Sequence, residues 1–346
     1  MTYRVGVDIG GTFTDFCAFD NESNSILTLK VLSEPDNPGA EVMRGIKELE
    51  SRYGVKPEEV TYFTHGTTVG VNTLIQRKGI KLALFVTKNF EDVLEVARLK
   101  MPDPYNLLST PPVPLIPRER VVSVDERTLH DGTVEKAPEL EGIAKALGDA
   151  KSLGAEGVVI ALINSYSNPE NEHRVKAFLQ EIDPDFPAFC SSDVWPIIRE
   201  YERTITASVH GYVQPRVSFY LESLQKALLD AGVEANPKVT KSNGGVMSAE
   251  SGRTECVQML LSGTAAGVIG ASFISNLSGF DNTMSLDIGG TSADVAFIRG
   301  GRPQYGIGEV VGEFPIYVPS VAVTSIGAGG GSIAWGDELG GLRVGP

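Results

Sequence analysis

One nine-residue motif occurs twice in this chain, once near each end. The first copy, Val7 to Asp15, reads VDIGGTFTD, and the second, Leu286 to Asp294, reads LDIGGTSAD, so six of the nine positions are identical. Each copy follows a short strand-like segment, turns on a Gly-Gly pair and enters a second apolar stretch. This pattern predicts a β-hairpin rather than a strand-to-helix loop. The chain is therefore expected to contain two equivalent hairpins, one in each half.

The residues of both turns suit phosphate binding. Glycines let backbone N–H groups approach phosphate oxygens closely, and Asp8 and Asp287, at the strand ends, are placed to hold a hydrated Mg²⁺ between the two loops. A tight glycine turn is the structural alternative for either copy alone, but such a turn has no need to repeat both aspartates. We therefore predict a nucleotide cleft between the two halves. Its predicted nucleotide contacts are Gly10, Gly11, Thr12, Thr14 and Asp15 in the first copy and Gly289, Gly290, Thr291 and Asp294 in the second.

A glycine-rich run, SIGAGGGS at Ser325 to Ser332, follows the second copy. It comes directly after the alternating segment 321–324, and its glycines would let the backbone pack flat against a planar ligand. A flexible loop is the alternative on composition alone. The order of hairpin, hairpin and glycine run favours contact with the nucleoside, through Gly327, Gly329, Gly330 and Gly331.

This order resembles that of the acetate and sugar kinase, heat-shock cognate and actin superfamily. Four further blocks narrow the resemblance to the A subunit of the hydantoinase, 5-oxoprolinase and acetone carboxylase family, over essentially the whole chain. Thr264 stands where that family usually has proline. The blocks are HGTTV at 65–69, IREYERT at 198–204, SNGG at 242–245 and LSG at 261–263.

The resemblance implies an actin-like (ribonuclease H-like) α/β fold with duplicated domains. It also implies ATP and Mg²⁺ as cofactors and activation of an amide or carbonyl oxygen of a small substrate by phosphorylation. A B subunit would complete hydrolysis or carboxylation. The A subunits of this family continue beyond the position of Pro346, so the second domain is expected to be truncated.

Few residues outside the loops offer other chemistry. The sequence has no Ser-His-Asp order, HExxH motif or His/Cys cluster that could hydrolyse an amide unaided. His65 precedes a helix whose first turn would present the N–H groups of Thr67 and Thr68 to an anion, although a core histidine is the alternative. Arg203 is assigned a substrate-side role, with a surface pair to Glu200 as its alternative. The predicted catalytic residues are Asp8, His65, Arg203 and Asp287.

Alternating strand-like and helical segments predict an α/β organisation. We place one domain at 1–198, with an inserted lobe at 101–137 over the cleft, and a second at 199–346. A hairpin is predicted at Asp131-Gly132 and a long helix from 197 to 231, bent at Pro215. The apolar run from 257 to 277 is predicted to be a buried helix.

Composition limits the kinds of partner that this chain is expected to bind. A net charge of −14 argues against nucleic acid or an anionic membrane, and the scattered Cys17, Cys190 and Cys256 are typical of buried free thiols in a reducing compartment. With no visible signal peptide, a cytoplasmic enzyme is predicted. Two alternatives stay open: a free-standing small-molecule kinase of the sugar kinase type, and a chaperone-like reactivating ATPase.

Overall fold

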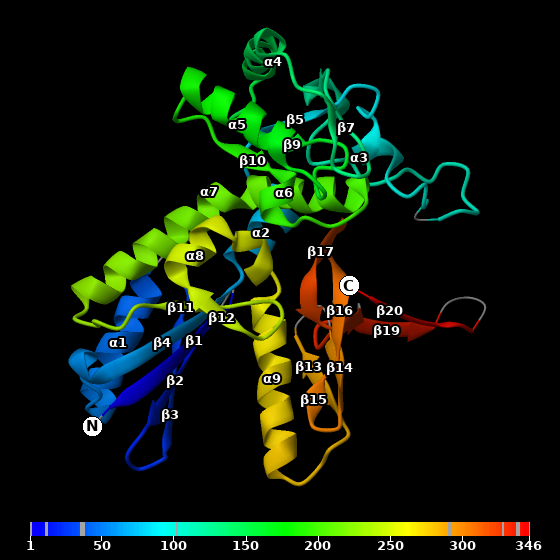
Figure 1. Cartoon of the computed structure of the whole chain (residues 1–346). Helices are drawn as coiled ribbons and strands as arrows, with labels where there is room; N and C mark the ends of the chain where they lie inside the picture. The colour runs from blue at the N-terminus through cyan, green and yellow to red at the C-terminus, as the bar shows by residue number, and fades with distance from the viewer. Residues whose placement is uncertain are drawn as a thin grey trace.

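The computed structural model of the chain describes residues 2–10, 13–34, 39–101, 103–289, 293–326, 329–336 and 340–345. It contains a six-stranded sheet, a lobe built on a four-stranded sheet, and a smaller second sheet (Figure 1). The long helix α7 (Glu200–Asp230), with Pro215 inside it, passes between the lobe and the other two sheets. The long helix expected from the sequence is confirmed.

The first hairpin lies inside the six-stranded sheet, whose order is β12-β11-β4-β1-β2-β3. Its strands are β1 (Tyr3–Ile9), β2 (Phe13–Asp20), β3 (Ile26–Leu32), β4 (Val60–Thr67), β11 (Lys238–Thr240) and β12 (Val246–Ser248). β1 to β3 form an antiparallel meander, whereas β4 and β11 run parallel to β1. Because β11 and β12 come from the second half of the sequence, the predicted domains 1–198 and 199–346 share this sheet.

One face of this sheet packs against α1 (Ala40–Tyr53). The alternating strands bury Val5, Val7 and Phe16, in keeping with the period of two that places alternate side chains on one face. Gly45 in α1 faces Phe16, and a Cβ there would lie 2.0 Å from a ring carbon. The helix therefore approaches the first hairpin closely only because this position is glycine.

The lobe has its own core and a fully parallel sheet. Its order is β10-β9-β5-β6, built from β5 (Leu82–Thr87), β6 (Val121–Val124), β9 (Gly157–Ala161) and β10 (Ala188–Cys190), with α4 (Leu140–Ser152) and α5 (Glu170–Ile182) packed on it. Every residue of β5 and β9 is buried, as expected for parallel strands covered on both faces.

The predicted lobe at 101–137 is one part of this larger body. β6, which lies within that range, pairs with β5. The hairpin expected at Asp131-Gly132 is confirmed between β7 (Arg127–Thr128) and β8 (Val134–Lys136). Gly132 has φ +87°, a left-handed conformation that explains the glycine.

The second hairpin, β13 (Thr283–Ile288) and β14 (Ala293–Arg299), repeats the register of the first. Asp287 pairs with Asp294 as Asp8 pairs with Asp15. β14 also pairs with β15 (Arg302–Pro303) and β18 (Thr324–Ile326). Among the described residues, the strands beside the second hairpin are therefore arranged differently from those beside the first. The duplicated hairpin is confirmed, whereas duplication of complete actin-like domains stays a prediction.

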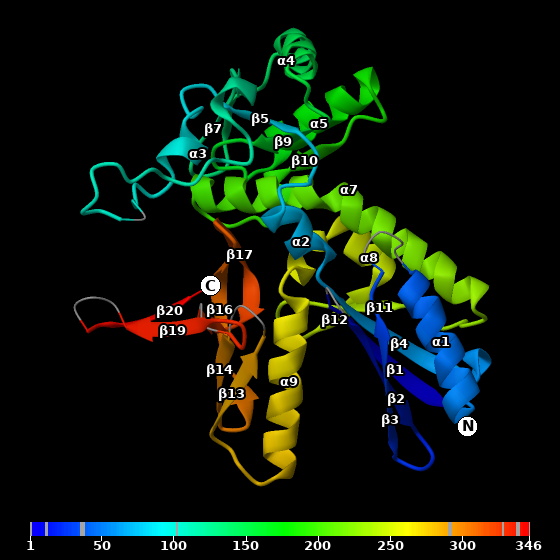
Figure 2. The ribbon, with the colours of Figure 1, turned by 180° about the vertical axis from the view of Figure 1, so that it is seen from behind.

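Helix α9 (Ser262–Leu277) contacts both β4 of the first sheet and β13 of the second (Figure 2). Phe273, Ile274 and Leu277 are exposed, so the expectation of a fully buried helix is wrong: only one side of α9 is covered. Cys17 is also exposed, contrary to prediction, because it lies on the face of β2 opposite Phe16.

No helix of the described ranges is long and apolar enough to span a membrane.

The remaining helices, turns and strands complete the fold. The connecting helices are α2 (Val69–Ile75), α3 (Val93–Val96), α6 (Ser191–Val194), α8 (Ala249–Thr254) and the 3₁₀ turns Pro57–Glu59, Arg118–Arg120 and Cys256–Met259, and the other strands are β16 (Tyr305–Val311), β17 (Phe314–Val321), β19 (Ile333–Gly336) and β20 (Leu342–Gly345).

Candidate functional site

Three of the sequence blocks meet at one edge of the six-stranded sheet. The parallel strands β1, β4 and β11 end at the same side, so the first glycine turn, the segment 65–68 and the turn 242–245 follow one another along that edge. The carboxyl ends of parallel strands are the usual position of ligand sites in α/β sheets. The fold therefore brings together segments that are far apart in the sequence.

Asp8 lies at the centre of this edge. It pairs in register with Gly66, and a Cβ on Gly66 would lie 3.2 Å from Oδ1 of Asp8. A Cβ on Gly263, at the start of α9, would lie 3.9 Å from the same oxygen. The two glycines thus leave space around the carboxylate of Asp8, beside the N-terminus of a sixteen-residue helix.

The electrostatics of Asp8 show that the second hairpin is close. The Asp8 side chain is exposed to solvent, yet neighbouring residues partly desolvate its carboxylate and so raise its pKa. The negative charges of Asp15 and Asp287 raise this pKa further. Since Asp287 belongs to the second hairpin, the two motif copies lie near each other in space. Carboxylate oxygens from two neighbouring hairpins are a donor set that suits a divalent cation.

The glycine run lies against the second hairpin. The N–H of Gly330 donates to the carbonyl oxygen of Gly289 at 2.9 Å, and the N–H of Gly329 donates to Oγ of Ser332 at 2.9 Å. On β18, the hydroxyl of Ser325 donates to Asp294 at 2.6 Å. The third predicted segment is thus anchored beside the second turn, and Gly331 follows in an exposed turn.

The first turn is held by a small polar network. The N–H of Gly10 donates to the carbonyl of Phe13 at 3.0 Å, and Oγ of Ser33 donates to the carbonyl of Gly10 at 2.8 Å. Thr14 is buried and hydrogen-bonds Ser33 at 2.9 Å, while Asp15 pairs with Lys30 at 3.2 Å. The Thr14 hydroxyl thus supports the turn from beneath, through a serine that the motif did not reveal, and nucleotide contact by Thr14 stays a prediction.

His65 is placed in the core rather than at the open edge. Burial lowers its pKa to about 4, and its two ring nitrogens contact the Val7 carbonyl oxygen at 3.4 Å and the Tyr220 hydroxyl at 2.5 Å. The placement matches the core-histidine alternative, and a catalytic role for His65 stays a prediction. Thr67 is buried too, whereas Thr68 is half-buried and hydrogen-bonds the carbonyl of Ile9 at 3.4 Å.

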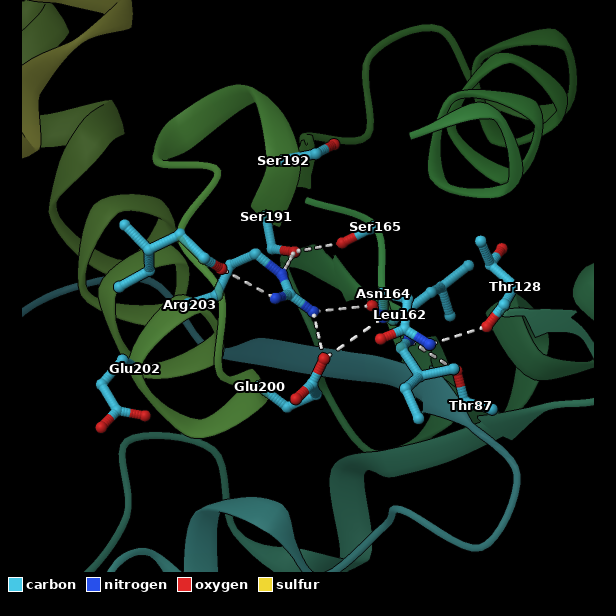
Figure 3. A network of polar contacts seen from close by, with 12 residues as sticks. Thr87, Thr128, Leu162, Asn164, Ser165, Ser191, Ser192, Glu200, Glu202 and Arg203 are labelled. Carbon is cyan, nitrogen blue, oxygen red and sulfur yellow. Dashed lines mark hydrogen bonds and ion pairs between the residues drawn. The ribbon is translucent and has the colours of Figure 1, made fainter. Parts of the chain in front are cut away.

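Arg203 lies in a separate buried network at the carboxyl edge of the lobe's sheet (Figure 3). Its Nε donates to Ser191 at 3.1 Å and its two terminal nitrogens donate to the carbonyls of Ile197 at 3.0 Å and Leu162 at 2.8 Å. Glu200 lies 3.3 Å away. These contacts fix the first turn of α7 to the lobe, and the substrate-side role of Arg203 stays a prediction.

The buried carboxylate of Glu172 completes the network that holds Arg203. It accepts hydrogen bonds from the Ser191 hydroxyl at 2.6 Å and the backbone N–H groups of Leu162 and Ser192, both at 2.9 Å. No sequence block pointed to this glutamate.

Five of the predicted nucleotide contacts lie outside the described residues: Gly11, Thr12, Gly290, Thr291 and Gly327.

Comparison with known families assigns both halves of the chain. Residues 4–183 match the hydantoinase/oxoprolinase N-terminal region and residues 203–346 match hydantoinase/oxoprolinase. The chain belongs to the hydantoinase/oxoprolinase family, as the sequence blocks indicated.

Individual relatives agree with this assignment. The chain is 32% identical to the caprolactamase subunit alpha of Pseudomonas jessenii, over 99% of the chain and 50% of the relative. It is 31% identical to the acetone carboxylase beta subunit of Xanthobacter autotrophicus, over 99% of the chain and 51% of that subunit. The crystal structure of the ATP-dependent caprolactamase from P. jessenii superposes with a TM-score of 0.88 at 30% identity, over 99% of the chain and 50% of that structure. The chain thus spans about half the length of these relatives.

Proposed function

We propose that this chain is the nucleotide-binding, A-type part of an ATP-dependent amidohydrolase or carboxylase. It would phosphorylate an amide or carbonyl oxygen of a small substrate, such as a cyclic amide or a ketone. The observation that carries the proposal is the repeated register of Asp8 with Asp15 and of Asp287 with Asp294, in hairpins whose aspartates are close enough to shift a pKa. The ATP-dependent relatives support the same reading.

The proposed step is a phosphoryl transfer. The substrate oxygen forms a bond to the γ-phosphorus of ATP, the bond from that phosphorus to the bridging oxygen breaks, and ADP leaves with the electron pair. Phosphoryl transfer asks a protein mainly for positioning and charge neutralisation. Glycine N–H groups of the two turns, apart from that of Gly10, which donates to Phe13, would hold the phosphates. The start of α9 beside Asp8 would add a favourable dipole.

Asp8 and Asp287 would hold a hydrated Mg²⁺ through its water molecules. When bound, the ion supplies positive charge that offsets the charge of the phosphates. The residues of this chain would orient ATP and the substrate oxygen, and a phosphorylated oxygen is a better leaving group for hydrolysis or carboxylation. Completion of the reaction is assigned to a B-type subunit, in keeping with relatives that are themselves named as subunits.

The first test compares Asp8→Asn and Asp287→Asn with Asp149→Asn, an exposed aspartate on α4. We expect either motif variant to weaken binding of Mg–ATP by about 10–100-fold, the range found when residues that orient a bound metal are changed. Calorimetry with Mg–ATP and circular dichroism of each variant provide the measurement. Unchanged affinity in a folded Asp287→Asn protein would contradict the two-hairpin site.

A second test separates the proposal from its alternatives. Phosphate release from Mg–ATP is measured with 5-oxoproline, caprolactam or acetone, with and without any polypeptide that copurifies with the chain. Activation that depends on such a partner supports the proposal. Phosphorylation of a sugar or an acid by the isolated chain would instead indicate a kinase, and nucleotide-dependent release of a bound enzyme would indicate a reactivating ATPase.

A further inference from the structure

A continuous chain of hydrogen bonds lies in the core beneath the first turn. The hydroxyl of Tyr220, on α7, is buried and lies 2.5 Å from Nε2 of His65 on β4. Nδ1 of the same imidazole lies 3.4 Å from the carbonyl oxygen of Val7. The chain therefore connects α7, β4 and β1.

The carbonyl oxygen of Val7 at one end fixes the direction of this chain. A backbone carbonyl can only accept, so Nδ1 of His65 carries the proton that points at Val7. The ring is neutral because burial lowers its pKa to about 4, which leaves Nε2 as an acceptor for the Tyr220 hydroxyl. Val7, His65 and Tyr220 thus have one role each, and a single tautomer of His65 satisfies all three.

The end of this chain lies one residue before Asp8. Val7 and His65 are paired across β1 and β4. The imidazole of His65 is therefore hydrogen-bonded to the β1 backbone close to the first turn. Both rings are buried, with centroids 5.5 Å apart at 42°. A fully satisfied polar network in a low-dielectric core is rigid, because any displacement leaves a buried donor or acceptor unpaired.

We propose that Tyr220 and His65 are positioning residues that hold the end of β1, and with it Asp8, in the geometry that binds metal and nucleotide. Neither side chain contacts the ligand in this arrangement. The inference rests on the proposed function of the two-hairpin site and adds a residue of α7 to it. Since α7 is also fixed to the lobe through Arg203, the same helix connects the lobe to the first turn.

The test compares Tyr220→Phe with Tyr212→Phe, a buried tyrosine on the same helix that packs against Gly79. Nitrogen NMR of labelled histidine should show the Nδ1–H tautomer for His65 in the wild type and in Tyr212→Phe, and a mixture of tautomers in Tyr220→Phe. Exchange of the Gly10 amide, which closes the turn onto Phe13, should be about ten-fold faster in Tyr220→Phe alone, as expected for the loss of one buried hydrogen bond. Exchange in β9 of the lobe should not change.

A second variant guards against a general loss of stability. His65→Asn keeps an N–H donor near the position of Nδ1, so it should protect the Gly10 amide better than His65→Leu. An Nε2–H tautomer in the wild type, or equal acceleration of exchange at Gly10 and in β9, would overturn the positioning role.

Nucleotide measurements then separate the two proposals. Tyr220→Phe should weaken Mg–ATP binding while Tyr212→Phe does not. If the wild type binds no Mg–ATP at all, the proposed function fails, whereas the tautomer and the Gly10 exchange still decide whether the pair positions the turn.

Discussion

The two hairpins share a motif and a register but bury opposite faces. Val5, Val7 and Ile9 in β1 are 1%, 4% and 8% exposed, whereas the equivalent Met284, Leu286 and Ile288 in β13 are 59%, 55% and 60% exposed. In the first hairpin this face packs under α1. In the second hairpin, among the described residues, the opposite face is buried. There Ala296 and Ile298 pack against Ala265 and Val268 of α9.

The comparison shows which properties are local. Alternating strands, a Gly-Gly turn and paired aspartates produce the same register twice, because these features depend on neighbouring residues. The face that becomes buried depends on which helix packs against it. Since α9 contacts both sheets, it covers the second hairpin from the side that faces the first.

The largest expected difference concerns a matched pair of isoleucines. Ile9→Ala should lower the free energy of unfolding by about 2–3 kcal/mol, as for truncation of a buried isoleucine, whereas Ile288→Ala should cost less than about 1 kcal/mol. Denaturant unfolding of both variants, at a concentration where the chain is monomeric, provides the comparison. Similar losses in the monomer would contradict the exposed placement of Ile288.

Acid should lower the stability of the chain through two buried histidines. Burial lowers the pKa of His65 and of His210, on α7, to about 4, below the ordinary value of 6.5. The unfolded chain therefore binds more protons between pH 6.5 and 4, so stability falls as the pH is lowered through that window. At pH 5 each histidine should remove about 2 kcal/mol relative to pH 7. Unfolding measured at both pH values checks this, and a flat profile would contradict the buried, neutral placement.

The exposed apolar face of the second hairpin should promote self-association of this chain. Large exposed apolar patches are uncommon on soluble monomers. We expect the double variant Leu286→Ser and Phe297→Ser to sediment as a smaller species than the wild type, with little change in thermal unfolding. A monomeric wild type would show that this face is tolerated in water.

The smallest effects concern the second aspartate of each motif. Asp15 pairs with Lys30 in an exposed ion pair, whereas Asp294 accepts from Ser325. Lys30→Ala should therefore change stability by less than about 1 kcal/mol, and less still at high salt. Ser325→Ala should act in the same range without salt dependence. Unfolding at two salt concentrations distinguishes the two, and equal salt dependence would remove this difference between the hairpins.

The sequence by itself determined the local elements and the family. The repeated hairpin, the glycine turn at Gly132 and the long helix through Pro215 all follow from residue periodicity and turn chemistry, which act over a few neighbouring positions. The ordered blocks along the chain identified the hydantoinase/oxoprolinase family for the same reason: each is a short segment with a recognisable pattern.

Only the tertiary structure decided how these elements are placed. It put His65 against Tyr220, more than a hundred residues away, and Arg203 in the network of the lobe; it also turned Thr14 inward and Cys17 outward. It brought β11 beside β4 and so joined the two halves in one sheet. Local patterns are silent on these outcomes because they depend on which surface packs against a strand, and that surface is supplied by distant parts of the chain.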